Sequence, residues 1–166
     1  METREKTAEW MTMEEITYVP QPVKKLLLAT DGSVSSVKAT KYCIGLAKKM
    51  NAEILAVYVS GSEDSVKIPE ELKGQSFFGG VHPCEAGLAV AKAFGKKNGV
   101  RVNTTILRGS IPRNIVKAAI ADNVDLIILG EHGRTGLSRI SLGNVAETVM
   151  RLAPCSVLIV REEEHE

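Results

Sequence analysis

The chain has few aromatic residues and no excess of either charge. Phe, Trp and Tyr make up 4% of its 166 residues, so aliphatic side chains must fill the core. Aromatic platforms that stack single-stranded nucleic-acid bases are correspondingly scarce. Lys and Arg number 21 against 20 Asp and Glu, and the resulting net charge of +1 gives no basic surface typical of nucleic-acid binding. We therefore expect no nucleic acid among the partners.

Cysteine and long apolar runs are also limited. The three cysteines (Cys43, Cys84 and Cys155) lie far apart without a CxxC pair, and the three histidines add no metal-ligand spacing. No apolar run approaches the ~20 residues of a membrane span, and the charged N-terminus leads into no signal segment. We expect no metal centre, no membrane partner and a reducing, cytoplasmic setting, with Cys43 and Cys155 as small buried side chains.

Composition divides the chain into three parts. Residues 1–22 carry both charge signs and the only Trp, and they end in Val19-Pro20-Gln21-Pro22, which resists helix formation. We interpret them as an N-terminal extension or arm. Residues 23–161 alternate apolar runs with helical patterns and are predicted to form one domain. Residues 162–166 form an acidic tail.

Within the domain, predicted strands and helices alternate. Short apolar runs predict five strands, at residues 23–29, 53–59, 100–107, 124–129 and 156–160. Helical spacing and helix-start signals predict four helices, at residues 34–50, 84–98, 112–122 and 144–152. Ser33 is the N-cap candidate of the first helix, and the glycines and prolines of residues 60–83 predict a long loop. This alternation predicts an α/β fold with a mainly parallel sheet and helices on both faces.

Sheets of this kind bind ligands beyond the carboxyl ends of their strands, where the strand order reverses. That rule points to the turn at residues 30–33 and to the loop that begins at Gly130. In this loop Gly130 and Gly133 let backbone N–H groups converge without Cβ atoms. A helix that starts at Gly143 and Asn144 offers free N–H groups and its dipole to an anion. Phosphate binding is one interpretation, and a connection that only turns the chain is the other.

Other charged residues near these turns leave alternatives open. Arg134 and Arg139 either reach a phosphate or are solvated, and Asp31 either faces a ligand or complements the dipole of the following helix. No Walker GxxxxGK[ST] run exists, and no GxGxxG follows the first strand. His132 lies in the loop, but no neighbouring serine and carboxylate are predicted to orient it as a general base. We expect no catalytic residues.

The glycine loop resembles that of the universal stress protein family, whose nucleotide-binding members carry G-x2-G-x9-G-[ST]. Gly130, Gly133 and Gly143 fall on that spacing. The flanking sequences agree as well, at residues 26–33, 125–129, 145–147 and 153–160. The resemblance covers about residues 23–161.

This resemblance implies an open, doubly wound, Rossmann-like sheet of five parallel strands in the order 3-2-1-4-5. It implies a homodimer through the edge strand 156–160, and ATP, ADP or AMP as cofactor, with or without Mg²⁺ or Mn²⁺. The adenosine would contact Ala29, Thr30, Asp31, Val59 (or the neighbouring Tyr58) and Leu129. The loop and the helix start would supply the other cofactor-binding residues, namely Gly130, His132, Gly133, Arg134, Gly143, Asn144 and Val145. Tyr58 is otherwise expected to place its hydroxyl at the surface.

One residue departs from the family pattern. Asn144 stands where the pattern has Ser or Thr; its amide can donate to a phosphate but is bulkier, and Asn is also a good N-cap. The implied function is an adenine-nucleotide-binding regulatory protein of the stress response. Two alternatives remain. One is a nucleotide-free dimeric interaction protein in which Asn144 has closed the site, and the other is a slow ATP hydrolase using Asp31, Glu131 or His132.

Overall fold

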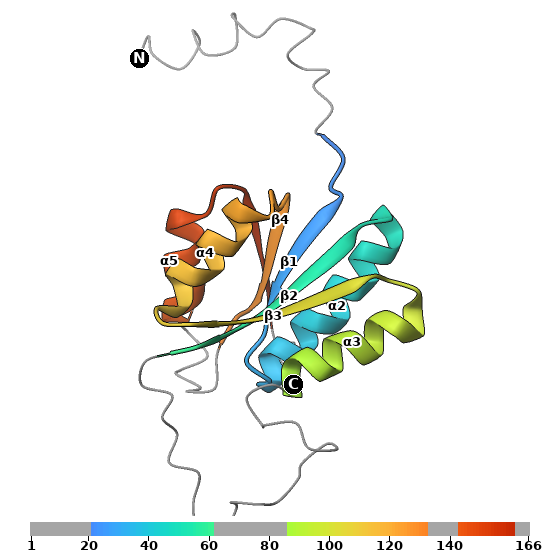
Figure 1. Cartoon of the computed structure of the whole chain (residues 1–166), viewed down its shortest axis with the longest axis horizontal. Helices are drawn as coiled ribbons and strands as arrows, with labels where there is room; N and C mark the ends of the chain where they lie inside the picture. The colour runs from blue at the N-terminus through green and yellow to red at the C-terminus, as the bar shows by residue number, and fades with distance from the viewer. Residues whose placement is uncertain (1–20, 62–85, 133–142, 162–166) are drawn as a thin grey trace, which may run out of the picture.

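The computed structural model describes residues 21–61, 86–132 and 143–161. They form one sheet of five parallel strands in the order β3-β2-β1-β4-β5 (Figure 1). The strands are β1 (Lys25–Ala29), β2 (Glu53–Ser60), β3 (Val102–Arg108), β4 (Leu126–Gly130) and β5 (Ser156–Val160). The helices are α2 (Val34–Met50), α3 (Ala86–Asn98), α4 (Ile111–Ala121) and α5 (Asn144–Leu152). The predicted fold class and strand order are confirmed.

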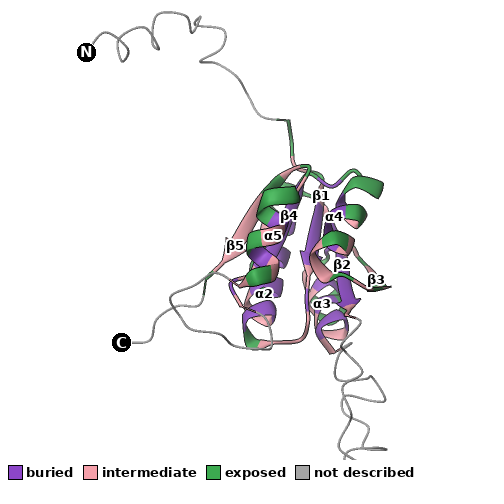
Figure 2. Cartoon of the chain, turned by 90° about the vertical axis from the view of Figure 1, so that its left-hand side faces the viewer, coloured by how far each residue is buried: buried purple, intermediate pink, exposed green. Residues whose placement is uncertain are grey.

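The helices form two layers, with α2 and α3 on one face of the sheet and α4 and α5 on the other (Figure 1). Successive side chains of β1 point to opposite faces. Leu26 and Leu28 therefore enter the cluster under α2 and α3, whereas Leu27 enters the cluster under α4 and α5. All three leucines are fully buried. Burial on both faces explains why the central strands are continuous apolar runs (Figure 2).

Capping residues define both ends of helix α2. The Ser33 side chain accepts the N–H of Ser36 at 3.2 Å, so Ser33 is the N-cap, as predicted. At the other end Asn51 adopts the left-handed conformation (φ 52°, ψ 49°), and its N–H reaches the carbonyl of Ala47. Asn tolerates this conformation better than most residues. The Ser33 cap fixes the start of α2 shortly after the end of β1.

Two glycines inside α3 lie where this helix approaches its neighbours most closely. A Cβ atom on Gly87 would overlap with the side chain of Thr30, directly after β1. A Cβ atom on Gly95 would overlap with the side chain of Val102 in β3. Glycine at both positions lets α3 pack tightly, although glycine inside a helix costs about 0.5–1 kcal/mol relative to alanine.

The strand boundaries differ slightly from the predicted ones. β1 and β4 both start two residues later than predicted, and Asp125, directly before β4, binds the start of β1. Its carboxylate accepts the backbone N–H groups of Lys24 and Lys25 at 2.8 and 2.9 Å, and its own N–H donates to the carbonyl of Lys25 at 2.9 Å. A charged side chain thus joins the beginnings of two neighbouring strands.

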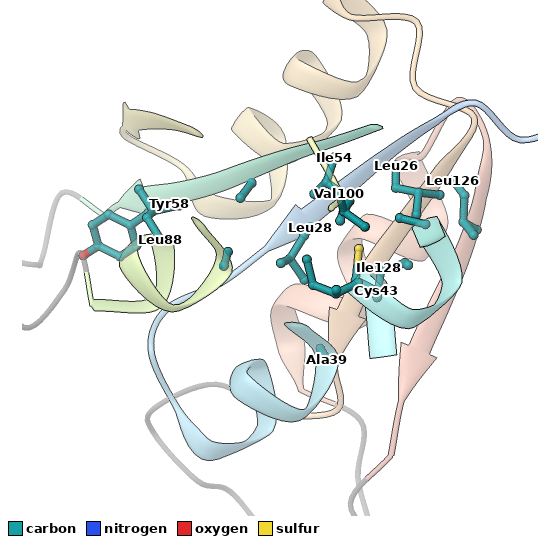
Figure 3. Packing of buried hydrophobic residues seen from close by; sticks show 14 residues of the cluster. Leu26, Leu28, Ala39, Cys43, Ile54, Tyr58, Leu88, Val100, Leu126 and Ile128 are labelled. Atoms are coloured by element: carbon teal, nitrogen blue, oxygen red, sulfur yellow. The ribbon is translucent and has the colours of Figure 1, made fainter. Parts of the chain in front are cut away.

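The two cysteines that the structure describes differ in burial. Cys43 is fully buried in the cluster under α2 and α3, as predicted (Figure 3), and burial raises its pKa to about 12. The prediction of a buried Cys155 is wrong, because this residue precedes the edge strand β5 and is only half-buried. Apart from residues 21, 22, 60 and 61, the predicted arm (1–22), loop (60–83) and tail (162–166) lie outside the described residues, as does Cys84. None of the described helices is both long and apolar enough to cross a membrane.

Candidate functional site

A cavity of about 280 Å³ lies at the carboxyl ends of β1, β2 and β4. The strand order reverses between β1 and β4, so the chain leaves these neighbours toward opposite faces of the sheet and a crevice remains between them. The cavity is lined by Ala29, Thr30, Asp31, Ser36, Val57, Tyr58, Val59, Ile111, Ile115, Leu129, Gly130, Glu131, His132, Gly143, Asn144, Val145 and Ala146.

Every predicted site residue within the described ranges lies on the wall of this cavity. These residues are Ala29, Thr30, Asp31, Val59, Leu129, Gly130, His132, Gly143, Asn144 and Val145. The predicted site residues Gly133 and Arg134 lie outside the described residues, as does Arg139. The fold therefore brings together three strand ends and one helix start that are far apart in the sequence. Their contacts with a nucleotide remain a prediction.

The turn after β1 is held by its own side chains. The Thr30 N–H donates to the carbonyl of Val57 at 3.0 Å, and the Thr30 hydroxyl donates to the hydroxyl of Ser36 at 3.1 Å. The carboxylate of Asp31 accepts the Ser33 N–H at 2.9 Å, which fixes it beside the start of α2. Asp31 thus supports the helix start and also lines the cavity, so the two interpretations of this residue are compatible.

Gly130 lies where α2 packs against the end of β4. A Cβ atom at this position would lie 2.6 Å from the Ser35 hydroxyl oxygen and 2.8 Å from the Ser35 carbonyl carbon. Real Cβ atoms do not approach backbone so closely, so this packing requires glycine. The sequence had suggested only that Gly130 exposes its amide. Ser35 also accepts the N–H of His132 at 3.2 Å, which joins the start of α2 to the loop after β4.

The start of α5 corrects two expectations. The N–H of Gly143 is not free, because it donates to the carbonyl of Glu131 at 3.0 Å. The N-cap of α5 is Gly143, so Asn144 is the first helical residue and the N-cap interpretation of Asn144 is wrong. Glycine has no side chain that could cap the first N–H groups of the helix, which belong to Asn144, Val145 and Ala146. These three residues line the cavity, and the positive end of the helix dipole is directed there.

Glu131 is the most consequential residue missing from the predicted cofactor-binding set. It is 7% exposed, and its carboxylate lies 3.2 Å from the guanidinium Nη2 of Arg161, which follows β5. His132 Nε2 lies 4.0 Å from the same carboxylate, too far for a hydrogen bond, so the two do not form an oriented acid–base pair. A charged residue directly after a buried strand was the available sequence signal.

The apolar wall was also incompletely predicted. Val57, Ile111 and Ile115 line the cavity, and the spacing of the two isoleucines on one face of α4 was the signal that could have found them. Tyr58, whose hydroxyl was expected at the surface, is 5% exposed as a residue, and its ring packs in the core cluster that also holds Leu88 (Figure 3).

The charges on the described wall are unbalanced. Asp31 and Glu131 contribute two carboxylates, and no lysine or arginine is among the described lining residues. Within the described ranges, no group of three or more His, Cys, Asp or Glu side chains could hold a metal ion by itself. A divalent cation would therefore need further ligands, such as phosphate oxygens.

Comparison with known proteins identifies the fold and its family. The model of the universal stress protein family matches residues 22–161. The chain belongs to the universal stress protein family. A universal stress protein of Methanocaldococcus jannaschii is 36% identical over 152 residues, which are 86% of this chain and 85% of that protein.

Two solved structures extend the comparison of this universal stress protein. The hypothetical protein MJ0577 is 26% identical with a TM-score of 0.67, covering 87% of this chain and all of that one. A universal stress protein crystallised in complex with cAMP is 25% identical with a TM-score of 0.60, covering 85% of this chain and 98% of that one. The fold of this chain is thus shared with both solved structures.

Proposed function

We propose that this universal stress protein binds an adenine nucleotide in the cavity at the ends of β1, β2 and β4. We further propose that it acts as a dimeric regulatory protein of the stress response. One observation carries the proposal. A single cavity of about 280 Å³ combines an apolar wall, a fixed carboxylate at Asp31 and the first N–H groups of α5, which no side chain of the N-cap residue binds.

The nucleoside part of the ligand would bind against the apolar wall of the cavity. Val57, Ile111 and Leu129 supply aliphatic surface, and the cavity is at the lower end of the volumes of small-molecule sites. The Asp31 carboxylate would accept hydrogen bonds from ribose hydroxyls or from the adenine amino group. Support comes from the relative solved with cAMP, which carries an adenosine moiety.

The phosphate part of the ligand matches the start of α5. N–H groups at a helix start, together with the helix dipole, favour an anion. The N–H groups of Asn144, Val145 and Ala146 are the ones available here, and the Asn144 amide could add a donor. Gly133 and Arg134, outside the described residues, would complete the phosphate site. Mg²⁺ or Mn²⁺ would bind between a carboxylate and the phosphates.

The dimer proposal concerns β5. This strand pairs with β4 alone among the described strands, and its apolar residues Val157, Leu158, Ile159 and Val160 are only half-buried. An exposed apolar edge strand is a ready surface for pairing with a second copy. Light scattering after gel filtration should give twice the chain mass of 17.9 kDa. A monomer mass at every concentration would contradict the dimer.

Regulation fits the site better than hydrolysis. A hydrolase needs a group within hydrogen-bond reach of the attacking water and a partner that orients it. His132 Nε2 lies 4.0 Å from the Glu131 carboxylate, too far for a hydrogen bond. The Ser35 hydroxyl accepts the backbone N–H of His132. We expect ATP turnover with Mg²⁺ or Mn²⁺ to stay close to the rate without protein. Nucleotide occupancy would instead change the surface that the dimer offers to partners.

Calorimetric titration with adenosine, AMP and ATP tests nucleotide binding. We expect saturable binding and a loss of about tenfold or more in adenosine affinity in Asp31→Asn, because a hydrogen bond to a charged group is lost. Asn retains an oxygen for the Ser33 N–H, so the turn is preserved. Asp122→Asn is the matched control, since Asp122 caps the far end of α4 and is not on the cavity wall. It should bind like the wild type.

Absence of saturable binding for all three ligands at millimolar concentration would refute the proposal. It would favour the nucleotide-free interaction protein, in which Asn144 closes the site. Mass spectrometry of small molecules released from the purified protein gives an independent answer. Recovery of an adenine nucleotide would exclude that alternative.

A further inference from the structure

We propose that Glu131 limits how much phosphate charge the cavity accepts. In the absence of divalent cations, the protein should bind adenosine and AMP more tightly than ATP. This inference rests on the proposed function, because it names the ligand class of the same cavity. It is argued from the position of Glu131, from its partners and from the other charges on the wall.

Glu131 lies beside the place where phosphates would bind. Its carbonyl oxygen accepts the N–H of Gly143 at 3.0 Å, so its backbone touches the residue that caps α5. The next three residues carry the first N–H groups of that helix, which no side chain of the N-cap residue binds. Glu131 is on the cavity wall and only 7% exposed, so solvent screens its charge poorly. We expect a phosphate drawn to the helix start to lie near this carboxylate.

The arginine that pairs with Glu131 among the described residues is itself largely exposed to solvent. Arg161 lies 3.2 Å from the carboxylate, but its side chain is 77% exposed, and water and salt screen it more than they screen Glu131. His132 Nε2 is 4.0 Å away. Asp31 adds a second carboxylate to the wall. The described wall thus favours a ligand with few negative charges.

The expected size of the effect follows from the electrostatics of like charges. Two unit charges several ångströms apart at a partly screened site repel enough to change affinity by about tenfold or more. ATP carries more negative charge than AMP, and adenosine carries none. We therefore expect the affinity for ATP without metal to fall at least about tenfold below that for AMP. Mg²⁺ neutralises part of the phosphate charge and should reduce the difference between the affinities for AMP and ATP.

The experiment measures affinities for adenosine, AMP and ATP by calorimetry in EDTA, with wild type and three variants. Glu131→Gln keeps the shape of the side chain and releases Arg161, so it should raise ATP affinity about tenfold or more and leave adenosine within about twofold. Arg161→Gln removes the countercharge, so it should weaken ATP further relative to AMP. Glu131→Gln and Arg161→Gln should therefore change the ratio of ATP affinity to AMP affinity in opposite directions. A structural defect would not be expected to produce such opposite changes.

Glu147→Gln is the matched control. Glu147 lies in the first turn of α5, and its carboxylate is 3.0 Å from Arg151 Nη2. This variant also removes one negative charge and releases one arginine, but Glu147 is half exposed and not on the cavity wall. Its ratio of ATP to AMP affinity should equal that of the wild type. Arg134 and Arg139 are unchanged in every variant.

The outcomes separate this inference from the proposed function. If adenosine and AMP bind but wild type prefers metal-free ATP, or if Glu131→Gln leaves the ratio unchanged, the inference is wrong and the proposed function stands. If adenosine, AMP and ATP all fail to bind, the proposed function fails and the inference with it.

Discussion

Replacing Gly130 with alanine should destabilise the protein before any ligand is considered. The new Cβ atom would meet three atoms of Ser35: the hydroxyl oxygen at 2.6 Å, the carbonyl carbon at 2.8 Å and the carbonyl oxygen at 2.9 Å. The hydroxyl can rotate away, although it would then lose the N–H of His132. The two backbone atoms cannot rotate, so α2 must shift away from β4.

The size of the effect follows from these contacts. Overpacking a well-packed interior costs about 1–3 kcal/mol. We expect about 3 kcal/mol for Gly130→Ala, because two of the three contacts involve backbone and the shift also breaks a hydrogen bond. For a protein of this size, 1 kcal/mol changes Tm by about 2–4 °C. The expected loss is therefore about 6–12 °C.

The assay is thermal unfolding followed by circular dichroism, on protein freed of nucleotide because a bound ligand would raise Tm. Gly45→Ala is the matched control. A Cβ atom at Gly45 would meet no other atom within 4 Å, and this residue lies inside α2. Alanine there should stabilise the protein by about 0.5–1 kcal/mol. The same substitution thus has opposite signs at the two positions.

A Tm for Gly130→Ala within about 2 °C of the wild type would refute the packing argument. The glycine would then be explained by its amide alone. A large loss of Tm in Gly45→Ala would equally show that these contact distances do not predict the cost of a methyl group.

Four further predictions concern the scaffold. Gly87→Ala should lower Tm, because its Cβ would overlap with the Thr30 side chain, and unchanged Tm would contradict the close approach of α3 to β1. Asp125→Ala should cost about 1–2 kcal/mol in urea unfolding, because the N–H groups of Lys24 and Lys25 lose their acceptor; a cost near zero would contradict this role. Cys43 should resist iodoacetamide in the native protein while Cys155 reacts, as read by mass spectrometry of digested protein. Burial raises the pKa of both thiols, but Cys43 is fully buried, with a pKa of about 12, whereas Cys155 is half-buried; equal rates would refute the burial of Cys43. The stability that this protonated thiol contributes is complete below its unfolded pKa of 9.0 and is lost as pH rises toward 12, so a stability that does not fall over this range would contradict the shift.

The fold was largely predictable because its pattern is local. Runs such as Leu26-Leu27-Leu28 and Leu126-Ile127-Ile128 are buried on both faces, as is typical of strands in a covered parallel sheet. Helix signals such as Ser33 lie next to the elements that they start. The order of the strands is different, since alternation does not determine it. The expected order came from the resemblance of the glycine loop to a known family.

The site was predictable to the level of strand ends and helix starts, but not to the level of individual contacts. The bond between Gly143 and Glu131 and the overlap between Gly130 and Ser35 depend on how segments far apart in the chain pack in space. The pairing of Glu131 with Arg161 likewise follows from β5 lying beside β4. The sequence contains all of these residues, but no local pattern indicates which of them meet.

The crevice between β1 and β4 has a consequence for how the protein holds a ligand. Its described walls come from residues between 29 and 59 on one side and from residues 111, 115, 129–132 and 143–146 on the other, so neither half of the chain encloses it alone. A ligand bound there would contact both halves of the chain and hold them together. The affinity for the ligand would then depend on the whole sheet being intact. A partner that separated the two halves would release the ligand.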